Sequence, residues 1–325
     1  MKEQKNIENN FGIKFSFVIA IYERENELKE LLESMANQTS KNFEVIVVDD
    51  GSKQCKLQNT VDLYKDKFTI EYHYKKNEGA SMARNFGVSF TKGEFVLFVD
   101  SDCILPANYI QSIENKLKKE SIQFFGGPDD ASQEFNLTQK ALSYAMTGFF
   151  TTGGIRGGVN NKNYQPRSFN MGILKSLFQK IGGFKNIDIG EDVDLSLRIK
   201  EKGIKPALIF EAKVFHKRRS NIQSFAKRVY QFGIMRPVLM QWHPASNRLV
   251  FFFPTLFLLG TIFLIASSYF SILTLIPLLI WIVGVLVESL IRYKNLFVSF
   301  LSLFKYVTSI MNIKKTCLNI KADFW

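Results

Sequence analysis

The sequence predicts an α/β fold in which a mostly parallel sheet carries helices on both faces and is followed by a helical, apolar C-terminal part. Two observations predict the sheet. Short apolar runs alternate with segments of helical periodicity, and the runs are almost continuous in β-branched and aromatic residues. A third observation predicts the C-terminal part, because residues 249–287 form a stretch of 39 positions without a charged side chain.

The strands and helices of the N-terminal part can be located in order. Four strands are expected, at FSFVIAIY (15–22), FEVIVVDD (43–50), FTIEYHY (68–74) and EFVLFVD (94–100). Helical spacing of the apolar residues marks 25–37 and 80–90 between them, and a later strand is expected at 207–215. Strands that alternate with helices in this way favour βαβ units and hence a parallel sheet.

The positive charge of the chain is concentrated toward its C-terminal side. The formal net charge is +12, and eight Lys and Arg residues but no Asp or Glu lie from Lys213 to Arg248. A basic stretch can bind nucleic acid, an anionic substrate or an anionic membrane surface. Because this one directly precedes the apolar stretch, we expect a lipid bilayer and no nucleic acid as its partner.

The apolar stretch predicts two membrane-spanning helices, at about 249–267 and 270–290. A single helix over its 39 positions would be about 58 Å long, roughly twice the thickness of the hydrocarbon core. The outer flanks of the pair are basic at Arg236, Arg248, Arg292 and Lys294. The positive-inside rule then places the N-terminal domain on the cytoplasmic side of the inner membrane. A helical hairpin buried inside a soluble protein is the alternative.

Polar residues also recur at steps of four and three after the apolar stretch, at Asn295, Ser299, Ser302, Tyr306 and Ser309. This spacing predicts a helix over 295–311 with one polar stripe. We expect that helix to lie in the membrane interface, within a cytoplasmic tail at 291–325, and a third span is the alternative. The other expected parts are an N-terminal extension at 1–13 and a basic amphipathic linker at 221–248.

Acidic residues follow two of the predicted strands directly. Asp49 and Asp50 precede Gly51-Ser52, and Asp100-Ser101-Asp102 ends the strand at 94–100. In an open α/β sheet, ligands bind at the carboxyl ends of the strands. Neighbouring carboxylates repel one another unless a positive charge intervenes, and Mg²⁺ or Mn²⁺ completed by phosphate oxygens and water can supply it. A polar strand end followed by a turn, with no ligand, is the alternative.

Four segments, in this order, resemble family 2 of the inverting glycosyltransferases, which have the GT-A fold. They are SFVIAIYERENELKELLESMANQTSKNFEVIVVDDGS (16–52), NEGASMARNFGVSFTKGEFVLFVDSD (77–102), IGGF (181–184) and IGEDVDLSLRIKEKG (189–203). The resemblance covers about residues 14–220. It implies a nucleotide-sugar half at about 14–105 and an acceptor half at about 106–220.

The resemblance implies roles for residues of the nucleotide-sugar half. Asp49 and Asp50 would contact the base or ribose of the nucleotide, with Asp50 the favoured direct contact. Ala20, Tyr22 and Glu23 would line the same pocket. The helix that carries Arg84 also contains Gly79, Asn85 and Gly87. Arg84 would lie against the base or the diphosphate, where a guanidinium can stack or form paired hydrogen bonds.

The resemblance also implies a metal site for Mg²⁺ or Mn²⁺. Asp100 and Ser101 would lie near the ribose, with Asp100 close enough to join the metal, and Asp102 would be the main metal ligand. His216, after the predicted strand at 207–215, would complete the site, although a structural histidine is the alternative. Lys217, Arg218 and Arg219 would meet the diphosphate or anionic lipid headgroups.

The acceptor half contributes the general base in this resemblance. Asp192 would take the proton of the acceptor hydroxyl, Glu191 would position the acceptor, and Asp194 is the less favoured base. Acids at the start of a helix are ordinarily stabilised by capping and by the helix dipole, so a purely structural role is the alternative.

The implied function is transfer of one hexosyl or hexosaminyl unit from a nucleotide-sugar, UDP-linked by default, to a glycan or polyprenyl-linked acceptor in cell-envelope synthesis. Processive members of the family carry a Gln-X-X-Arg-Trp signature. Here Gln231 is followed by Ile234 three residues later, and Arg236 is followed by Pro237, which favours non-processive transfer.

Two other functions remain possible at this point. A nucleotidyltransferase could also use paired acids and a metal at a sheet edge, but it usually has an early glycine-rich phosphate loop, which residues 20–30 lack. A membrane scaffold with a degenerate catalytic domain would have no need of Asp102 and Asp192.

Overall fold

The computed structural model describes residues 14–54, 56–130, 137, 140–141, 144, 148–152, 164–216, 222–247 and 252–302. The chain divides into two compact units. Unit 1 comprises residues 1–130 and 161–217, and unit 2 comprises residues 131–160 and 218–325. All of the expected nucleotide and catalytic residues belong to unit 1.

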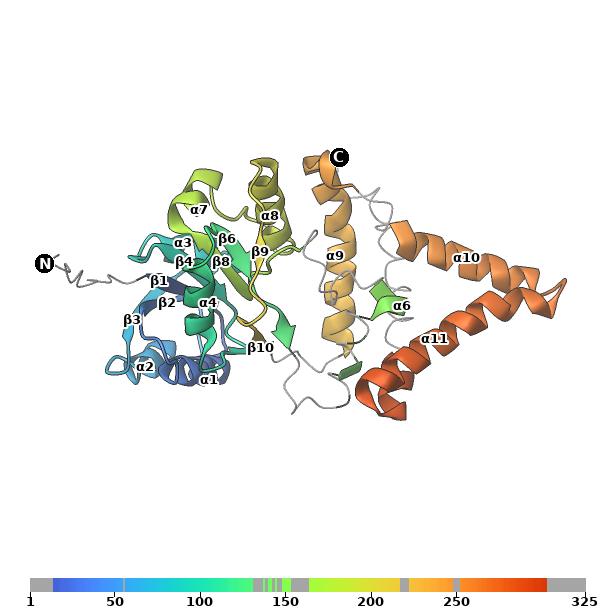
Figure 1. Ribbon diagram of the computed structural model, residues 1–325, viewed down its shortest axis with the longest axis horizontal. Helices are drawn as coiled ribbons and strands as arrows, with labels where there is room; N and C mark the ends of the chain where they lie inside the picture. The colour runs from blue at the N-terminus through green and yellow to red at the C-terminus, as the bar shows by residue number, and fades with distance from the viewer. Residues whose placement is uncertain are drawn as a thin grey trace, which may run out of the picture. The chain divides into compact units, whose positions relative to one another are not determined.

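Within the described residues, unit 1 contains a seven-stranded sheet in the order β3-β2-β1-β4-β8-β6-β9 (Figure 1). Its strands are β1 (Phe15–Ile21), β2 (Phe43–Asp50), β3 (Thr69–Lys75), β4 (Phe95–Val99), β6 (Phe124–Gly126), β8 (Asn170–Leu174) and β9 (Ala207–Leu208). Strands β3, β2, β1 and β4 are parallel to one another, whereas β8 runs antiparallel to both β4 and β6. The predicted α/β architecture with a mostly parallel sheet is therefore confirmed.

Each of the four N-terminal strands lies within one residue of its predicted position. The later strand, predicted at 207–215, is wrong as a single element because a turn over 210–212 divides it. Its first part is β9, and its second part is β10 (Val214–His216), which joins a separate sheet with β5 (Cys103–Ile104) and β7 (Asp129–Asp130). The division brings the backbone of β10 against the segment that follows Asp102.

Helices cover both faces of the large sheet because the central strands are buried on both sides. On one face, Phe17 and Ile19 of β1 belong to a core formed with α1 (Glu25–Ala36), α2 (Leu57–Asp62) and α4 (Tyr109–Leu117). On the other face, Val18 packs with α3 (Ala80–Val88), α7 (Lys175–Ile181) and α8 (Glu191–Glu201). This alternation follows the two-residue period of a strand and explains the nearly continuous apolar sequence of β1.

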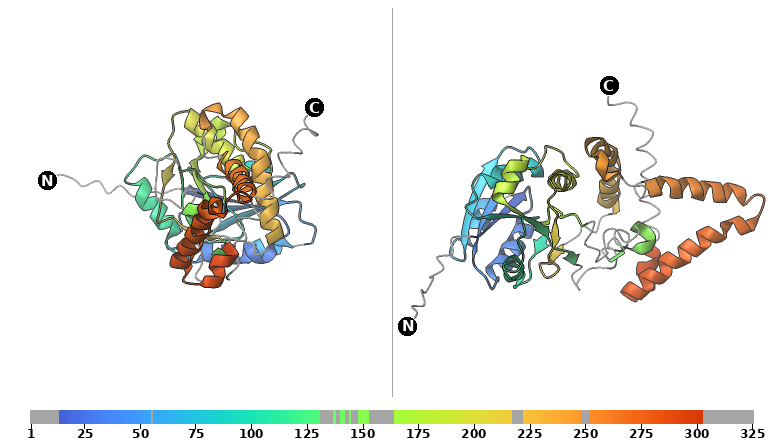
Figure 2. Two further views of the ribbon diagram at one scale, coloured as in Figure 1. Left: turned by 90° about the vertical axis from the view of Figure 1, so that its right-hand side faces the viewer. Right: turned by 45° about the horizontal axis from the view of Figure 1, so that its top comes forward.

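In unit 2, one described helical segment, Ile272–Tyr293, is long and apolar enough to cross a membrane, with a mean hydropathy of 2.3. It consists of the short helix η4 (Ile272–Leu275) followed by α11 (Ile276–Tyr293). The preceding helix is α10 (Phe253–Ser267) (Figure 2). Such a segment is by itself weak evidence for a membrane anchor. The 15 residues of α10 extend only about 22 Å, less than the hydrocarbon core, so the expectation of two spans stays a prediction.

The polar stripe predicted after the apolar stretch does not face water where the structure describes it. Ser299 and Ser302 are fully buried, and the hydroxyl of Ser302 lies 3.4 Å from that of Ser289 in α11. Leu296 and Phe297, by contrast, are exposed. The Ser302 hydroxyl therefore contacts a neighbouring helix, whereas the Ser299 hydroxyl donates to the carbonyl of Asn295 in its own segment. The rest of the predicted helix, from 303 to 311, lies outside the described residues.

Glu288, the acid that ends the uncharged stretch, holds a second segment of unit 2. Its carboxylate accepts hydrogen bonds from the Tyr144 hydroxyl at 2.7 Å and from the backbone N–H groups of Phe149 and Phe150 at 2.8 and 3.2 Å. The last two residues begin the short helix α6 (Phe149–Thr152). The linker expected at 221–248 is largely the helix α9 (Ile222–Trp242), which contains Pro237.

Candidate active site

The candidate site of unit 1 forms where β1, β2 and β4 end at the same edge of the sheet. In the parallel register, Ile21 at the end of β1 lies opposite Asp49 near the end of β2. Asp100 follows β4 directly. The carboxylates predicted at two separate strand ends are thus brought to one edge, as the topology of a parallel sheet requires.

The two acids at the end of β2 are buried and held by short-range hydrogen bonds. Asp49 accepts from the backbone N–H of Ser52 at 2.8 Å and from the hydroxyl of Tyr72 at 2.7 Å. Burial, together with the Asp49 carboxylate, raises the pKa of the Tyr72 hydroxyl far above its ordinary value, so that Tyr72 remains a donor. Asp49 therefore fixes the turn after β2.

Asp50 fixes the start of α3 in a similar way. Its oxygens accept from the backbone N–H groups of Gly79 at 2.8 Å and Glu78 at 3.0 Å, and from the ammonium of Lys75 at 3.1 Å. Gly79 precedes α3 with a φ of 92°, a conformation that glycine adopts without strain. These three hydrogen bonds make Asp50 shape the loop before α3, and its expected contact with the base or ribose of a nucleotide stays a prediction.

The residues after β1 face the turn that follows β2. Glu23, with a positive φ of 53°, accepts from the backbone N–H of Lys53 at 2.6 Å and donates its own N–H to the Ser52 hydroxyl at 2.9 Å. Its carboxylate is thus used within the protein. Tyr22 is 47% exposed, and Ala20 and Glu23 are less exposed than Tyr22. Tyr22 therefore has the side chain most open to a ligand in this segment.

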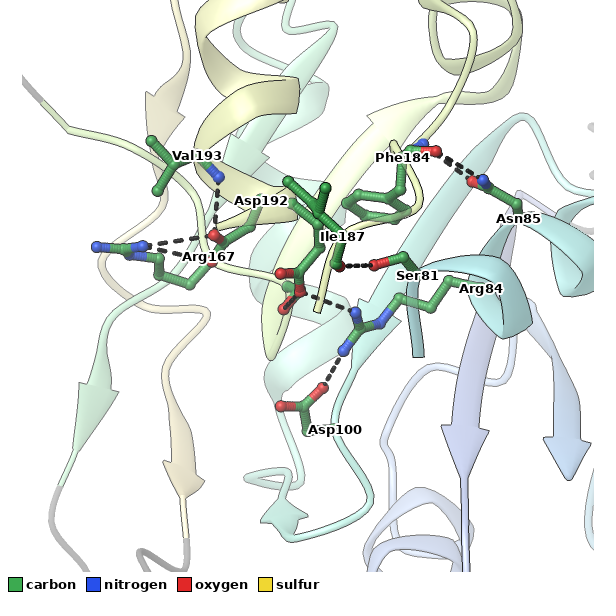
Figure 3. Close-up of polar contacts among 11 residues, drawn as sticks. Ser81, Arg84, Asn85, Asp100, Arg167, Phe184, Ile187, Asp192 and Val193 are labelled. Atoms are coloured by element: carbon green, nitrogen blue, oxygen red, sulfur yellow. Dashed lines mark hydrogen bonds and ion pairs between the residues drawn. The ribbon is translucent and has the colours of Figure 1, made fainter. Parts of the chain in front are cut away.

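Helix α3 connects the strand ends to the segment that leads into α8 (Figure 3). The Ser81 hydroxyl donates to the carbonyl of Ile187 at 2.9 Å. The amide of Asn85 donates to the carbonyl of Phe184 at 2.8 Å and accepts from the N–H of Phe184 at 2.9 Å. Since residues three and four apart share one face of a helix, this face of α3 is devoted to holding residues 184–187.

Arg84, on the same face of α3, joins the two halves of the site (Figure 3). Its Nη2 lies 2.7 Å from Oδ1 of Asp100, and its Nη1 lies 3.1 Å from Oε1 of Glu191. Burial alone would lower the pKa of the guanidinium, but these two carboxylates raise it, and the net shift is upward. Arg84 is therefore a permanent, buried cation between the end of β4 and the start of α8.

The acids at the start of α8 are held by residues of the preceding segment. Arg167 Nη1 lies 3.5 and 3.4 Å from the two oxygens of Asp192, and the Ser168 hydroxyl donates to Glu191 at 3.2 Å. Burial raises the pKa of Glu191, and the charge of Asp192 raises it further, although Arg84 opposes the shift. The site thus contains Glu191, whose pKa is raised, beside Asp192, which Arg167 contacts at 3.4–3.5 Å.

Two of the three acids in the first turn of α8 have roles in local structure. Asp192 accepts from the backbone N–H of Val193 at 2.7 Å, so part of the expected capping role is present. Asp194 is fully buried and pairs with Arg198 at 2.7 Å and with Lys185 at 3.0 Å. These contacts fix α8 against the loop before it, and they leave Asp192 as the better placed of the two for chemistry.

The expected metal ligands Asp100 and Asp102 follow β4, with side chains 31% and 15% exposed. Among the described residues, no group of three or more His, Cys, Asp or Glu could hold a metal ion by itself. Two carboxylates nevertheless fit Mg²⁺ or Mn²⁺ that arrives with phosphate oxygens and water. A guanidinium already lies against each of them, because Arg84 Nη2 is 2.7 Å from Oδ1 of Asp100 and Arg24 Nη1 is 3.2 Å from Oδ2 of Asp102.

His216 lies at the end of β10, where its backbone pairs with that of Cys103, the residue after Asp102. Its side chain lies outside the described residues, as do Lys217, Arg218 and Arg219. The backbone pairing is compatible with a contribution of His216 to the expected metal site, which stays a prediction.

Three polar residues of the site were not found from the sequence: Arg24, Arg167 and Ser168. Arg24 directly follows the predicted Ala20–Glu23 segment, so its place in the loop after β1 is a signal that was available. Arg167 and Ser168 lie between 153–163 and β8, in a region with no periodicity or motif to mark them.

The order of the sheet and the carboxylates at its strand ends agree with the GT-A fold that the sequence resemblance implies. The sequence profile described as Glycosyl transferase family 2 matches residues 16–182, about half of the chain. The chain therefore belongs to glycosyl transferase family 2.

Curated relatives have the same family character. An uncharacterized glycosyltransferase of Rickettsia felis is 35% identical over 189 residues, which are 58% of this chain and 30% of that protein. The minor teichoic acid biosynthesis protein GgaB of Bacillus subtilis is 28% identical over 235 residues, 66% of this chain and 24% of that protein. The chain spans about 30% of the length of three Rickettsia glycosyltransferases that it matches.

Solved structures share the fold at low identity. The mannosyltransferase PcManGT from Pyrobaculum calidifontis, in complex with GDP-Man and Mn²⁺, matches with a TM-score of 0.59 and 13% identity, over 97% of this chain and 89% of that one. S. aureus TarS 1–349, in complex with UDP-GlcNAc, matches with a TM-score of 0.51 and 17% identity, over 95% of this chain and 91% of that one.

Proposed function

We propose that this protein is a membrane-anchored, metal-dependent, inverting glycosyltransferase that moves one sugar from a nucleotide-sugar to a hydroxyl of a glycan or polyprenyl-linked acceptor. The observation that carries the proposal is the buried Arg84, which joins the Asp100 carboxylate at the strand end to Glu191 beside Asp192. It brings a strand-end acid of the donor side close to the candidate base of the acceptor side.

On the donor side, the exposed ring of Tyr22 would stack against the nucleotide base, beside the turns that Asp49 and Asp50 hold in place. Asp100 and Asp102, with His216, would hold Mg²⁺ or Mn²⁺. When bound, this ion would supply the positive charge that stabilises the departing nucleoside diphosphate. The complexes of TarS with UDP-GlcNAc and of PcManGT with GDP-Man and Mn²⁺ support a nucleotide-sugar donor, and UDP is our default base.

On the acceptor side, Asp192 would accept the proton of the acceptor hydroxyl. The acceptor oxygen then forms its bond to the anomeric carbon while the bond from that carbon to the diphosphate oxygen breaks, and a single displacement inverts the configuration. Arg167 and Ser168 would orient the two carboxylates, and Glu191 would position the acceptor. A general base of this kind is typically worth about 10²–10⁴ in rate.

The membrane anchor in this proposal rests on the C-terminal helices. Large apolar side chains are exposed along both α10 and α11, among them Leu256, Ile262, Phe263, Leu279, Ile280 and Val283. The basic residues from Lys213 to Arg248 would face the cytoplasmic leaflet. An acceptor at that surface, together with the likeness to GgaB, supports a role in cell-envelope synthesis.

Hydrolysis of sugar nucleotides with Mn²⁺ tests the proposal without knowledge of the acceptor. We expect slow release of nucleoside diphosphate from at least one UDP- or GDP-sugar. Asp102→Ala should abolish the release by removing the main metal ligand, and Asp192→Asn should lower it by removing the base. Asp66→Asn is the matched control, because its side chain is 71% exposed and lies at the surface.

Two outcomes would contradict this function. Absence of turnover with every donor, together with absence of a Mn²⁺-dependent thermal shift by UDP or GDP, would favour a scaffold. Release of pyrophosphate from nucleoside triphosphate and sugar phosphate would favour a nucleotidyltransferase.

A further inference from the structure

Arg24 is a positively charged residue on the donor side of the site. It belongs neither to the acidic strand ends nor to α3, the helix that carries Arg84. It directly precedes α1, and its Nη1 lies 3.2 Å from Oδ2 of Asp102, a residue 78 positions later in the chain. The side chains of Arg24 and Asp102 are 27% and 15% exposed. This ion pair therefore lies in the site but remains within reach of solvent.

The neighbouring ion pairs show why Arg24 differs from the other arginines. Arg84 is 6% exposed in its side chain and contacts two acids, Asp100 and Glu191, so its removal from either would leave a buried charge without compensation. Arg24 contacts one carboxylate in a position that solvent can reach, so this ion pair can be exchanged at a smaller cost than the buried pairs of Arg84.

The charge balance of the site favours such an exchange. Four carboxylates (Asp100, Asp102, Glu191 and Asp192) are matched by three guanidinium groups (Arg24, Arg84 and Arg167). A divalent cation that binds alone has to compete with the arginines for the carboxylates. A diphosphate that binds alone is repelled by the carboxylates, because both are negatively charged. A divalent cation bound to the diphosphate of a nucleotide-sugar is nearly neutral, so this complex leaves the balance unchanged.

We propose that Arg24 is the internal counter-ion of the metal position: it neutralises Asp102 until a divalent cation and a diphosphate bind, and it then pairs with the diphosphate. The proposal rests on the metal-dependent transfer proposed above and names the residue that couples the two ligands. Arg24 can do so because a dication on the Asp102 carboxylate repels the guanidinium about 3 Å away, which weakens this ion pair and favours transfer of Arg24 to the diphosphate.

The chemistry of arginine supports its second position. A guanidinium forms paired, charge-assisted hydrogen bonds with phosphate oxygens, and it remains charged under all conditions in which the enzyme would work. Arg24 leaves the end of β1 immediately after the segment of Tyr22 and Glu23, which borders the predicted nucleotide pocket. The same side chain would therefore weaken binding of the cation alone and strengthen binding of the diphosphate once the cation is present.

The test measures binding of each ligand by the full-length chain purified in detergent. Free Mn²⁺ is followed by electron paramagnetic resonance, and UDP binding at saturating Mn²⁺ is followed by calorimetry. The variants are Arg24→Gln, which removes the charge, and Arg24→Lys, which keeps it. Lys29→Gln is the matched control, because it removes an exposed cation from the second turn of α1. Thermal unfolding checks that each variant is folded.

We expect Arg24→Gln to bind Mn²⁺ alone about fivefold more tightly than the wild type, because a partly exposed competitor has been removed. The same variant should bind UDP about tenfold more weakly in the presence of Mn²⁺, because a charge-assisted contact has been lost. Arg24→Lys should keep most of both wild-type values, and Lys29→Gln should match the wild type in both measurements.

Each other result overturns a defined part of the inference. An unchanged or weaker Mn²⁺ affinity in Arg24→Gln would show that Arg24 does not compete with the cation. Tighter Mn²⁺ binding with unchanged UDP affinity would exclude the transfer of Arg24 to the diphosphate. A wild type that binds no Mn²⁺ with or without UDP, and that behaves like Asp102→Ala, would overturn the metal-dependent function together with this inference.

Discussion

The acids at the end of β2 differ from Asp102 and Asp192 in the kind of group that donates to them. Asp49 and Asp50 accept mainly from backbone N–H groups and from close neighbours on β3. Asp102 and Asp192 have arginine partners that come from other segments, at 3.2–3.5 Å. A backbone donor is fixed by the fold, whereas an arginine side chain can turn to another partner.

This difference suggests how to tell an acid that builds a site from an acid that works in it. Removing a buried carboxylate from backbone donors leaves those donors without a partner, and the cost appears in stability. Removing a carboxylate from a partly exposed arginine leaves the arginine free to reach water, and the cost should appear in binding or rate. The predictions below test this distinction, beginning with the largest expected effect.

Asp192→Asn should reduce sugar transfer by about 10²–10⁴ while leaving nucleotide binding intact, because the amide cannot accept the proton of the acceptor hydroxyl. Its Val193 N–H contact can be kept by the amide oxygen, so the thermal midpoint should move little. Steady-state rates with a sugar nucleotide and Mn²⁺, beside UDP calorimetry, measure both quantities. A large loss of stability with unchanged rate would place Asp192 among the structural acids.

Asp50→Ala should have the opposite profile and destabilise unit 1 by about 3 kcal/mol. The substitution removes the charged acceptor of the backbone N–H groups of Glu78 and Gly79 at the start of α3, and a hydrogen bond to a charged group contributes about 1.5–3 kcal/mol. Chemical unfolding of the purified chain measures the effect, with the exposed Asp66→Ala as control. Stability equal to that of the control would mean that Asp50 is held for ligand binding alone.

Asn85→Ala tests whether α3 transmits this rigidity to the acceptor side. The side-chain amide forms two hydrogen bonds with the backbone of Phe184, so we expect a loss of about 1–2 kcal/mol in stability and a moderate fall in rate. Ser89→Ala, at the exposed end of the same helix, is the control because its hydroxyl bonds only within the helix end. If Asn85→Ala left both quantities unchanged, residues 184–187 would be held by other contacts.

The sheet was predictable because buried parallel strands have an unambiguous sequence pattern. In β1 every residue but one is buried, which agrees with the nearly continuous apolar sequence from which the strand at 15–22 was predicted. The prediction of one strand at 207–215 was wrong because Phe210, although apolar, lies exposed in a turn that divides the segment. The apolar sequence pattern alone does not distinguish such a residue from a buried strand residue. A short strand whose ends pair with two different sheets depends on tertiary contacts that local sequence does not contain.

The acidic residues of the candidate site and Arg84 were named from the sequence, whereas the basic residues Arg24 and Arg167 were not. Carboxylates at the ends of strands and at the start of α8 have a position that local sequence fixes. The partner of a carboxylate depends on which long side chain can reach it, and Arg24 reaches Asp102 across 78 positions. Similarly, the polar stripe at 295–311 was recognised, but its burial at Ser299 and Ser302 required knowledge of the neighbouring helix α11.

Glu191→Gln is the prediction with the smallest effect, and it addresses the one acid that does not fit either group. Glu191 faces Arg84 from α3, Asp100 after β4, Ser168 and its neighbour Asp192. Burial and the charge of Asp192 raise its pKa above the ordinary value of 4.5. A raised pKa in the folded state means that the ionised form is disfavoured by folding, so stability is lost as the pH rises through the folded pKa.

Gln cannot ionise and keeps an oxygen that can accept from Arg84. The stability of Glu191→Gln relative to the wild type should therefore increase as the pH is raised from 4.5 toward neutrality. Thermal midpoints of both proteins over this range measure it. The opposite trend would mean that attraction to Arg84 outweighs burial, and Glu191 would then be a structural acid of the same kind as Asp50.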